Sequence, residues 1–259
     1  MTPLLEVRHV TRSYRMPRRS LLHPGPVLTA VQDVSFTLAR GRTLGIVGES
    51  GSGKSTLARM IMAFEAPDTG EVRFDGHDLH SLGSADLRRL RRRFQMVFQD
   101  PWGSLDPRRT VAWSIAEPLR ATGADAIARR VDEALVQVGL RPADGRKYPH
   151  EFSGGQRQRI AIARAIVTRP ALLVADEAVS ALDVSVQAQI LNLLMDLQEE
   201  LGLAMIFISH DLPVVACLAD DMLVMRAGRP VETGATASLI SAPKAEYTKS
   251  LLTAGGLMP

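Results

Sequence analysis

The feature that most constrains this chain is a glycine-rich loop between a predicted strand and a predicted helix. Residues 48–56 read GESGSGKST, which matches the pattern G-x-x-x-x-G-K-[ST]. The apolar run at residues 43–47 predicts the strand, and apolar residues at helical spacing from Leu57 to Phe64 predict the helix. Glycine lets a backbone approach a ligand closely, and the N–H groups at a helix start attract anions. The loop therefore predicts a nucleoside-triphosphate site.

Individual positions of this loop have expected roles. Lys54 supplies a mobile positive charge for the β- and γ-phosphates, and the hydroxyl of Ser55 can bind Mg²⁺. A glycine- and serine-rich turn without a ligand is the alternative, and the flanking strand and helix make it the weaker one. The predicted nucleotide-binding residues of the loop are Gly48, Glu49, Ser50, Gly51, Ser52, Gly53, Lys54, Ser55 and Thr56.

Composition narrows the class of protein. With 259 residues, 46% of them hydrophobic, the chain can bury one large core or a core with a small lobe. Its net charge of +3 does not require a nucleic-acid partner, and we interpret the arginine run at 88–93 as a solvated helix face. Contact of this run with anionic lipid headgroups or a membrane protein is the functional alternative.

Cysteine usage and hydropathy predict a soluble protein from a reducing compartment. The single cysteine, Cys217, allows neither an intramolecular disulfide nor a cysteine-built metal site, and we expect it to pack inside an apolar helix at 212–218. No apolar run approaches the roughly 20 residues needed to cross a bilayer, and the first residues lack the pattern of a secretory signal. Any role at a membrane then requires a partner.

Strands and helices alternate on both sides of an all-helical stretch that begins near residue 106 and ends near residue 169. This order predicts an α/β fold with a mainly parallel sheet wrapped by helices. Residues 15–26, with three prolines and a glycine, predict an irregular loop. The predicted strands lie at residues 4–10, 31–38, 43–47, 71–74, 95–99, 171–175, 204–208, 223–225 and 229–232. The last two flank Gly228 and predict a hairpin. Predicted helices lie at 84–93, 111–120, 157–167 and 212–218, with others around Val131 and after Asp183. We expect Asp183 to cap the helix that follows it.

Two carboxylates follow the apolar strand at 171–175. Asp176 stands where an aspartate can hold Mg²⁺ beside a bound phosphate, and Glu177 can polarise an attacking water as a general base. Two solvated acids at a strand end would be the better interpretation in a chain without the phosphate loop. With the loop present, the pair predicts hydrolysis of a nucleoside triphosphate.

A second candidate phosphate site begins at Ser153. Residues 153–159 read SGGQRQR and open the predicted helix at 157–167. Ser153 is a good N-cap, and Gly154 and Gly155 expose backbone amides. Alone, this string would describe a capped helix with a glycine turn.

The run at 153–159 resembles the signature motif of the ATP-binding-cassette (ABC) ATPases, and further elements of that family follow in the expected order over nearly the whole chain. Gln99 resembles the Q-loop glutamine, and SALD at 180–183 resembles the D-loop. His210 resembles the switch histidine. Tyr14 resembles the aromatic residue that stacks on adenine.

A finer resemblance is to the oligopeptide, dipeptide and nickel importer branch of this family. QMVFQDP at 95–101 and SLDPR at 104–108 are similar to that branch. Ala178 stands where many relatives have proline. The chain also lacks the C-terminal cysteine cluster of many peptide-type relatives, so no iron–sulfur or zinc site is expected, and the cargo (a peptide, nickel or another small solute) stays open.

The resemblance implies a P-loop NTPase of ABC type that forms one domain over residues 1–259. Residues 1–105 and 170–235 would form the α/β core with an antiparallel β subdomain. Residues 106–169 would form an inserted helical signature subdomain, and residues 236–259 a C-terminal helical tail.

The resemblance also implies how the residues would work. Two such domains would meet head to tail and enclose two ATP molecules, with Mg²⁺ held by Ser55, Gln99 and Asp176. Gln99, Glu177 and His210 would serve catalysis, Glu177 as the base and His210 as the γ-phosphate sensor. The further nucleotide-binding residues would be Tyr14, Ser153, Gly154, Gly155, Gln156 and Asp183.

The implied protein is an ATPase subunit that powers a membrane importer from the cytoplasmic face of a bacterial plasma membrane. Its partners would be a second ATPase subunit (a heterodimer favoured over a homodimer), separate permease subunits and, indirectly, an extracytoplasmic solute-binding protein. One alternative is the ATPase subunit of a soluble complex of the carbon–phosphorus lyase type. A DNA-repair ABC ATPase fits less well, because residues 55–153 contain no sustained heptads and no cysteine.

Overall fold

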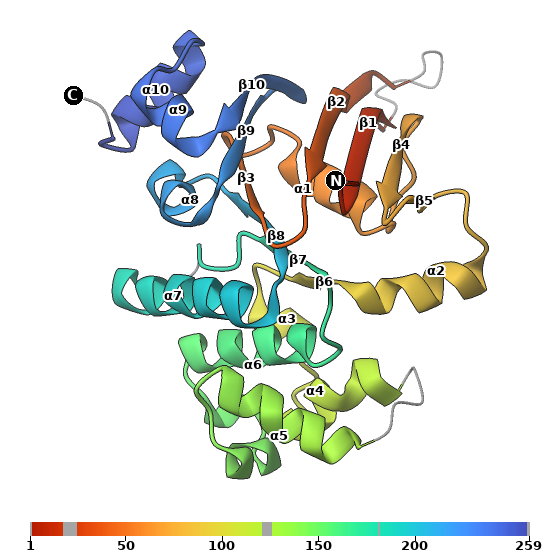
Figure 1. Cartoon of the computed structure of the whole chain (residues 1–259), viewed down its shortest axis with the longest axis vertical. Coiled ribbons are helices and arrows are strands. Elements are labelled where there is room, and N and C mark those ends of the chain that lie inside the picture. Colours follow the sequence, from red (N-terminus) through yellow and green to blue (C-terminus); the bar gives the residue numbers. More distant parts are fainter. Residues whose placement is uncertain (1, 18–24, 121–125, 181, 258–259) are drawn as a thin grey trace. The chain divides into compact units, whose positions relative to one another are not determined.

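The computed structural model describes residues 2–17, 25–120, 126–180 and 182–257 (Figure 1). The chain forms two compact units. The first combines Met1–Gly83 with Phe207–Pro259, and the second is Ser84–Ile206. Most of the irregular loop predicted at 15–26, and Ala181 of the D-loop, lie outside the described residues.

An antiparallel sheet in the order β2-β1-β4-β5 lies in the first unit. Strand β1 runs further along the chain than predicted and pairs with β2 as far as Arg15↔Val27. Register shifts near Val10, with His9 at φ +49°, break the apolar alternation on which the shorter prediction depended. The strands are β1 (Leu5–Arg15), β2 (Val27–Leu38), β4 (Thr69–Phe74) and β5 (His77–Asp78).

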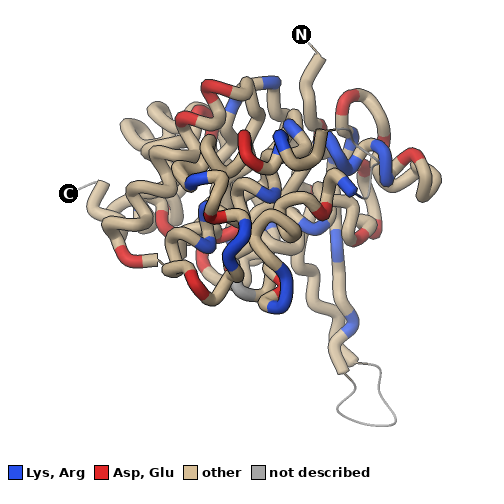
Figure 2. Tube along the Cα trace, turned by 90° about the horizontal axis from the view of Figure 1, so that it is seen from below, with Lys and Arg blue, Asp and Glu red and all other residues tan. Residues whose placement is uncertain are grey.

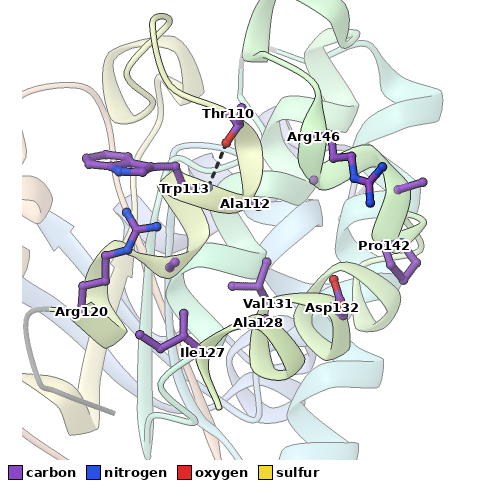
Figure 3. A pocket seen from close by; sticks show the side chains of 13 residues that line it. Thr110, Ala112, Trp113, Arg120, Ile127, Ala128, Val131, Asp132, Pro142 and Arg146 are labelled. Atoms are coloured by element: carbon purple, nitrogen blue, oxygen red, sulfur yellow. Dashed lines mark hydrogen bonds between the residues drawn. The ribbon is translucent and has the colours of Figure 1, made fainter. Parts of the chain in front are cut away.

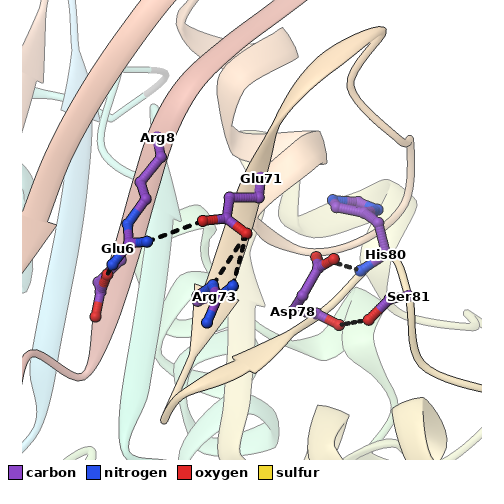
Figure 4. A network of polar contacts seen from close by, with 7 residues as sticks. All are labelled: Glu6, Arg8, Glu71, Arg73, Asp78, His80 and Ser81. Atoms are coloured by element: carbon purple, nitrogen blue, oxygen red, sulfur yellow. Dashed lines mark hydrogen bonds and ion pairs between the residues drawn. The ribbon is translucent and has the colours of Figure 1, made fainter.

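A polar network joins β1 to β4 and extends beyond β5 (Figure 4). Arg8 of β1 donates to Glu71 of β4 at 3.0 Å, and Arg73 donates to the same carboxylate at 2.9 Å. The hydrogen bond from Arg73 lowers the pKa of Glu71. His80 Nε2 donates to the carbonyl of Met60 at 3.0 Å, near the end of the helix that follows the phosphate loop. His80 therefore helps to position that helix.

The phosphate loop belongs to a second group of strands in the same unit. Strand β3 (Thr43–Val47) is buried throughout and pairs in parallel with β9 (Asp221–Arg226). Strand β10 (Arg229–Ala235) returns antiparallel to β9, which confirms the hairpin predicted around Gly228. The helices of this unit are α1 (Lys54–Ile61), α8 (Leu212–Leu218), α9 (Thr236–Ser241) and α10 (Glu246–Ala254).

The expectation that Cys217 packs inside α8 is wrong, because its side chain is exposed. The helix has the predicted bounds and buries Leu212, Val214 and Val215. Two helical residues turn the chain by about 200°, so Cys217 lies on the side opposite Val215. The helix is apolar on more than its buried face, and composition alone could not show which side faces the core.

In the second unit, β6 (Phe94–Val97) pairs in parallel with β7 (Leu172–Asp176), and β8 (Ala204–Ser209) begins there. Helix α4 has the predicted bounds, and the arginine-rich helix ends early and continues as a 3-10 turn, η1. The helices are α2 (Ser84–Leu90), α3 (Pro101–Ser104), α4 (Val111–Arg120), α5 (Ile127–Gln137), α6 (Gly154–Ile166) and α7 (Val184–Leu201). The 3-10 turns are η1 (Arg91–Arg93), η2 (Pro142–Arg146) and η3 (Pro149–Glu151).

Basic and acidic residues are interspersed along the trace (Figure 2). Arg42 pairs with Asp220 at 3.0 Å, and Arg89 of α2 lies 3.6 Å from Asp86. Local pairing of this kind agrees with the small net charge of +3. Within the described part of the chain, no helix is both long enough and apolar enough to cross a bilayer.

Candidate functional site

The phosphate loop turns at glycines that no other residue could replace without strain. Gly53 has φ +100°, and a Cβ there would lie 2.1 Å from the carbonyl oxygen of Ala30. Gly48 has φ +154°, and its Cβ would lie 2.1 Å from the carbonyl oxygen of Met225. Gly53 is also the N-cap of α1 and offers no side-chain acceptor to the first helical turn. The loop therefore presents backbone amides, with no capping side chain at the helix start.

Lys54 lies inside this loop. Its side chain is only 4% exposed, and Nζ donates to the carbonyl oxygens of Gly48 at 2.7 Å and Glu49 at 2.9 Å. A buried ammonium group is costly unless hydrogen bonds compensate for lost water, and these carbonyls provide them. Positive charge and a helix N-terminus at one loop fit a polyanion such as a triphosphate.

Tyr14 lies in β1 and is held by neighbours that sequence reasoning did not identify. Its hydroxyl hydrogen-bonds to Glu65, and the guanidinium carbon of Arg12 lies 5.1 Å from the ring centroid. Arg12 in turn donates to Asp68 at 2.8 Å, and this contact raises the pKa of Arg12. The only sequence signal was the i, i+2 spacing of Arg12 and Tyr14, which places both on one face of a strand.

In the second unit, the structure brings together three of the predicted motifs. Glu177 follows β7 with φ +48°, a left-handed conformation that is rare for a residue with a side chain. Its carbonyl oxygen accepts the hydroxyl of Ser180 at 2.9 Å, and Gln99 Nε2 donates to Ser180 Oγ at 3.2 Å. The Q-loop glutamine, the D-loop and the residues after Asp176 therefore form one hydrogen-bonded group.

Asp183 confirms its predicted role as the cap of the following helix. Its carboxylate accepts the amide of Val186 at 3.0 Å and the hydroxyl of Ser185 at 2.8 Å. These hydrogen bonds, the Val186 amide first, lower the pKa of Asp183. A direct role of Asp183 in nucleotide binding stays a prediction.

The signature segment forms a capping box at the start of α6. The side chain of Ser153 accepts the amide of Gln156 at 3.4 Å, and the Gln156 side chain accepts the amide of Ser153 at 3.0 Å. The cap was predicted, and the helix begins at Gly154 rather than at residue 157. A Cβ on Gly155 would lie 2.4 Å from Cγ1 of Val186, so this glycine is also needed for packing against α7.

The predicted site residues are divided between the two units. The phosphate loop, Tyr14 and His210 belong to the first unit, where His210 follows β8 and is exposed. The second unit carries the remaining predicted residues. They are Gln99, Ser153, Gly154, Gly155, Gln156, Asp176, Glu177 and Asp183.

A groove of about 830 Å³ lies within the second unit, between α4, α5 and η2 (Figure 3). Trp113 lies at its edge, with the guanidinium carbons of Arg109 and Arg120 at 4.7 and 5.2 Å from its ring centroid. The predicted nucleotide-binding residues are absent from the described lining. The lining includes Trp113, Arg120, Ile127, Val131, Asp132 and Arg146.

Comparison with known proteins places these motifs in a family. The family model described as ABC transporter matches residues 31–180. The oligopeptide transport ATP-binding protein OppD of Mycobacterium tuberculosis is 51% identical over 252 residues, which is 96% of this chain but 41% of that protein. The chain thus spans about two fifths of the length of that relative. A putative peptide import ATP-binding protein of Brucella abortus is 46% identical over 256 residues, 98% of this chain and 78% of that protein.

A solved structure agrees over most of the chain. The ATP-binding cassette MJ0796, a dimer in a post-hydrolysis state bound to ADP and Pi, aligns with a TM-score of 0.78 at 29% identity. The alignment covers 90% of this chain and 98% of that one. The chain therefore has the α/β fold of an ATP-binding cassette, as the sequence predicted.

Proposed function

The chain belongs to the ABC transporter family, and we propose on that premise that it binds and hydrolyses ATP to power a membrane importer. The names of the relatives favour peptides as the cargo. The sequence resemblance also allows nickel or a related small solute. The observation that carries the proposal is the phosphate loop, where a buried Lys54 lies inside a turn that only glycines can form. No feature of the described residues favours a soluble lyase complex or a DNA-repair role.

ATP and Mg²⁺ fit the residues present. Bound ATP would supply the phosphoanhydride bond whose hydrolysis powers transport. The phosphate-loop amides and Lys54 would hold the phosphates, and Tyr14 would stack on the base. Oxygen donors suit Mg²⁺, and Ser55, Gln99 and Asp176 would provide them.

Glu177 would accept a proton from the attacking water, and His210 would contact the γ-phosphate. Ser180 links Glu177 to the Q-loop glutamine. Its hydroxyl donates a hydrogen bond to the carbonyl of Glu177 and accepts one from the side-chain amide of Gln99. A displacement of Gln99 would therefore move Ser180 and, through it, the backbone of Glu177. We infer that this link couples hydrolysis to movement of the helical segment 106–169, which begins shortly after Gln99.

A second ATPase subunit would complete each nucleotide site. The amides at the start of α6, exposed by Gly154 and Gly155, form an anion site that this chain would offer to its partner's nucleotide. The dimeric state of MJ0796 supports such an arrangement. We favour a heterodimer, peripheral to the cytoplasmic face of the membrane, with separate permease subunits.

Tyr14→Ala should raise the Michaelis constant for ATP at least about fivefold, because stacking of a base on an aromatic ring contributes about 1–3 kcal/mol. The maximal rate should change little, since Tyr14 would touch the base and not the reacting phosphates. Steady-state ATPase kinetics measure both quantities. Tyr14→Phe is the matched control: it keeps the ring and loses only the contact with Glu65. A pure rate defect in Tyr14→Ala would contradict the stacking role.

The groove in the second unit is the surface that we propose for the permease. Apolar residues such as Ile127 and Val131 line it together with Arg120 and Arg146. Two arginines beside one aspartate, Asp132, complement a short helix that carries an apolar face and acidic side chains. The partner that we propose for this groove is a cytoplasmic helix of a permease subunit.

Ala128→Trp should abolish permease binding, because the indole would fill the groove that Ala128 lines. The measurement is recovery of transmembrane subunits after affinity purification of the chain in detergent from membranes of its native cells. Ala237→Trp, at an exposed alanine of α9, is the matched control and should retain the permease. Recovery of soluble enzymes in place of membrane subunits would overturn the importer proposal, and full recovery with Ala128→Trp would overturn the groove assignment.

A further inference from the structure

The C-terminal helix α10 reaches the phosphate loop through a single side chain. The backbone N–H of Glu49 donates to Tyr247 Oη at 3.3 Å. The carbonyl of the same residue accepts Lys54 Nζ at 2.9 Å and the amide of Ser52 at 3.1 Å. Both backbone polar groups of Glu49 therefore have hydrogen-bond partners. The carbonyl is bound by the loop itself, and the N–H is bound by a residue 198 positions away along the chain.

Tyr247 is itself held firmly in this position. Its side chain is only 8% exposed, and the guanidinium carbon of Arg226 lies 4.6 Å from its ring centroid. Arg226 ends β9, the strand that pairs in parallel with β3 and places Val224 opposite Val47. The carbonyl of Met225 is also the group that leaves no room for a Cβ on Gly48. The ring thus packs against the end of the strand that borders the loop.

The helix that carries Tyr247 is anchored at its start. Glu232 of β10 accepts the amides of Lys244 at 2.9 Å and Ala245 at 3.0 Å, just before α10 begins. Thr248 beside Tyr247 is 1% exposed. These contacts fix the first turn of α10 against the hairpin β9–β10, so the position of the tyrosine hydroxyl is set by the fold.

We propose that Tyr247 is a positioning residue for the phosphate loop. Its hydroxyl accepts the N–H of the Gly48–Glu49 peptide, and Lys54 Nζ donates to the carbonyl of that same peptide, the Gly48 oxygen, at 2.7 Å. A loop fixed in this way loses less conformational entropy when its remaining amides bind phosphate, so its affinity for nucleotide is higher. The inference rests on the proposed function, because the loop is taken to bind ATP.

Tyr247→Phe removes the hydroxyl and keeps the ring beside Arg226. We expect the Michaelis constant for ATP to rise about three- to tenfold, the range for one lost hydrogen bond, with the maximal rate changed less than twofold. Hydrogen exchange of the apo protein, followed by NMR, should show faster exchange of the Glu49 amide in the variant. Exchange of the Val111 amide, which donates to the carbonyl of Lys147 in the second unit at 2.9 Å, serves as the internal reference.

Tyr148→Phe is the matched control. Tyr148 is exposed, its ring stacks on His150 at a centroid distance of 5.8 Å, and it belongs to the second unit. It should leave both kinetic constants unchanged. Unchanged exchange at Glu49, or an unchanged Michaelis constant, in a folded Tyr247→Phe protein would overturn the proposal.

The wild-type protein gives a test that does not depend on folding of the variant. Its Glu49 amide must be protected without nucleotide, and rapid exchange there would refute the contact. A wild-type chain that binds no ATP would instead refute the proposed function, and the exchange result would still stand on its own.

Discussion

Glu177→Gln will abolish ATP turnover while ATP binding is retained. The amide has nearly the shape of the carboxylate but cannot accept a proton from water, and general-base catalysis contributes about 10²–10⁴-fold to rate. The substitution should not disturb the backbone, since the carbonyl of Glu177 stays fastened by Ser180 at 2.9 Å. Turnover should fall by at least about 100-fold, measured as phosphate release.

The same variant should accumulate as a dimer in the presence of ATP, because hydrolysis is the step that would release the two subunits. Gel filtration with light scattering, with and without ATP, measures this. Glu200→Gln is the matched control, since Glu200 is an exposed residue of α7 that contacts Gln137 at 2.9 Å. A Glu177→Gln protein that stays monomeric with ATP and still hydrolyses it would show that the base lies elsewhere.

Lys54→Ala will weaken ATP binding itself. The variant loses a buried ammonium that would contact the phosphates, and charge-assisted hydrogen bonds contribute about 1.5–3 kcal/mol each. It also loses the bonds to the carbonyls of Gly48 and Glu49 that hold the loop in shape. We expect the dissociation constant for ATP to rise at least about tenfold.

Calorimetric titration with ATP measures this constant, and a thermal melt shows whether the variant is folded. Lys249→Ala is the control with the same change of charge, because Lys249 is a half-exposed residue that pairs with Glu246 at 2.6 Å. Equal ATP affinities of wild type and Lys54→Ala would contradict the assignment of the phosphate loop.

Local patterns predicted much of the fold. The helices Val111–Arg120 and Leu212–Leu218 have the predicted bounds, and the hairpin around Gly228 is present. The caps at Ser153 and Asp183 were also predicted. Such features depend on residues within three or four positions of each other, so a short stretch of sequence contains the whole signal.

Other features were missed for identifiable reasons. The strand β1 continues past a bulge, which interrupts the alternation that marks a strand. The exposure of Cys217 depends on which side of α8 meets its neighbours. The contacts of Tyr14 with Glu65 join residues 51 positions apart, and no local pattern predicts them.

The sequence by itself determined the α/β fold, the phosphate loop and the order of motifs that places the chain in its family. It could do so because each motif is a run of residue types whose spacing the chemistry of a phosphate or a helix start requires. Only the tertiary structure decided how those motifs are supported. Ser180 connects Gln99 to Glu177 by hydrogen bonds, and the hydroxyl of Tyr247 accepts the amide of Glu49. These contacts join residues distant along the chain, and packing alone brings such residues together.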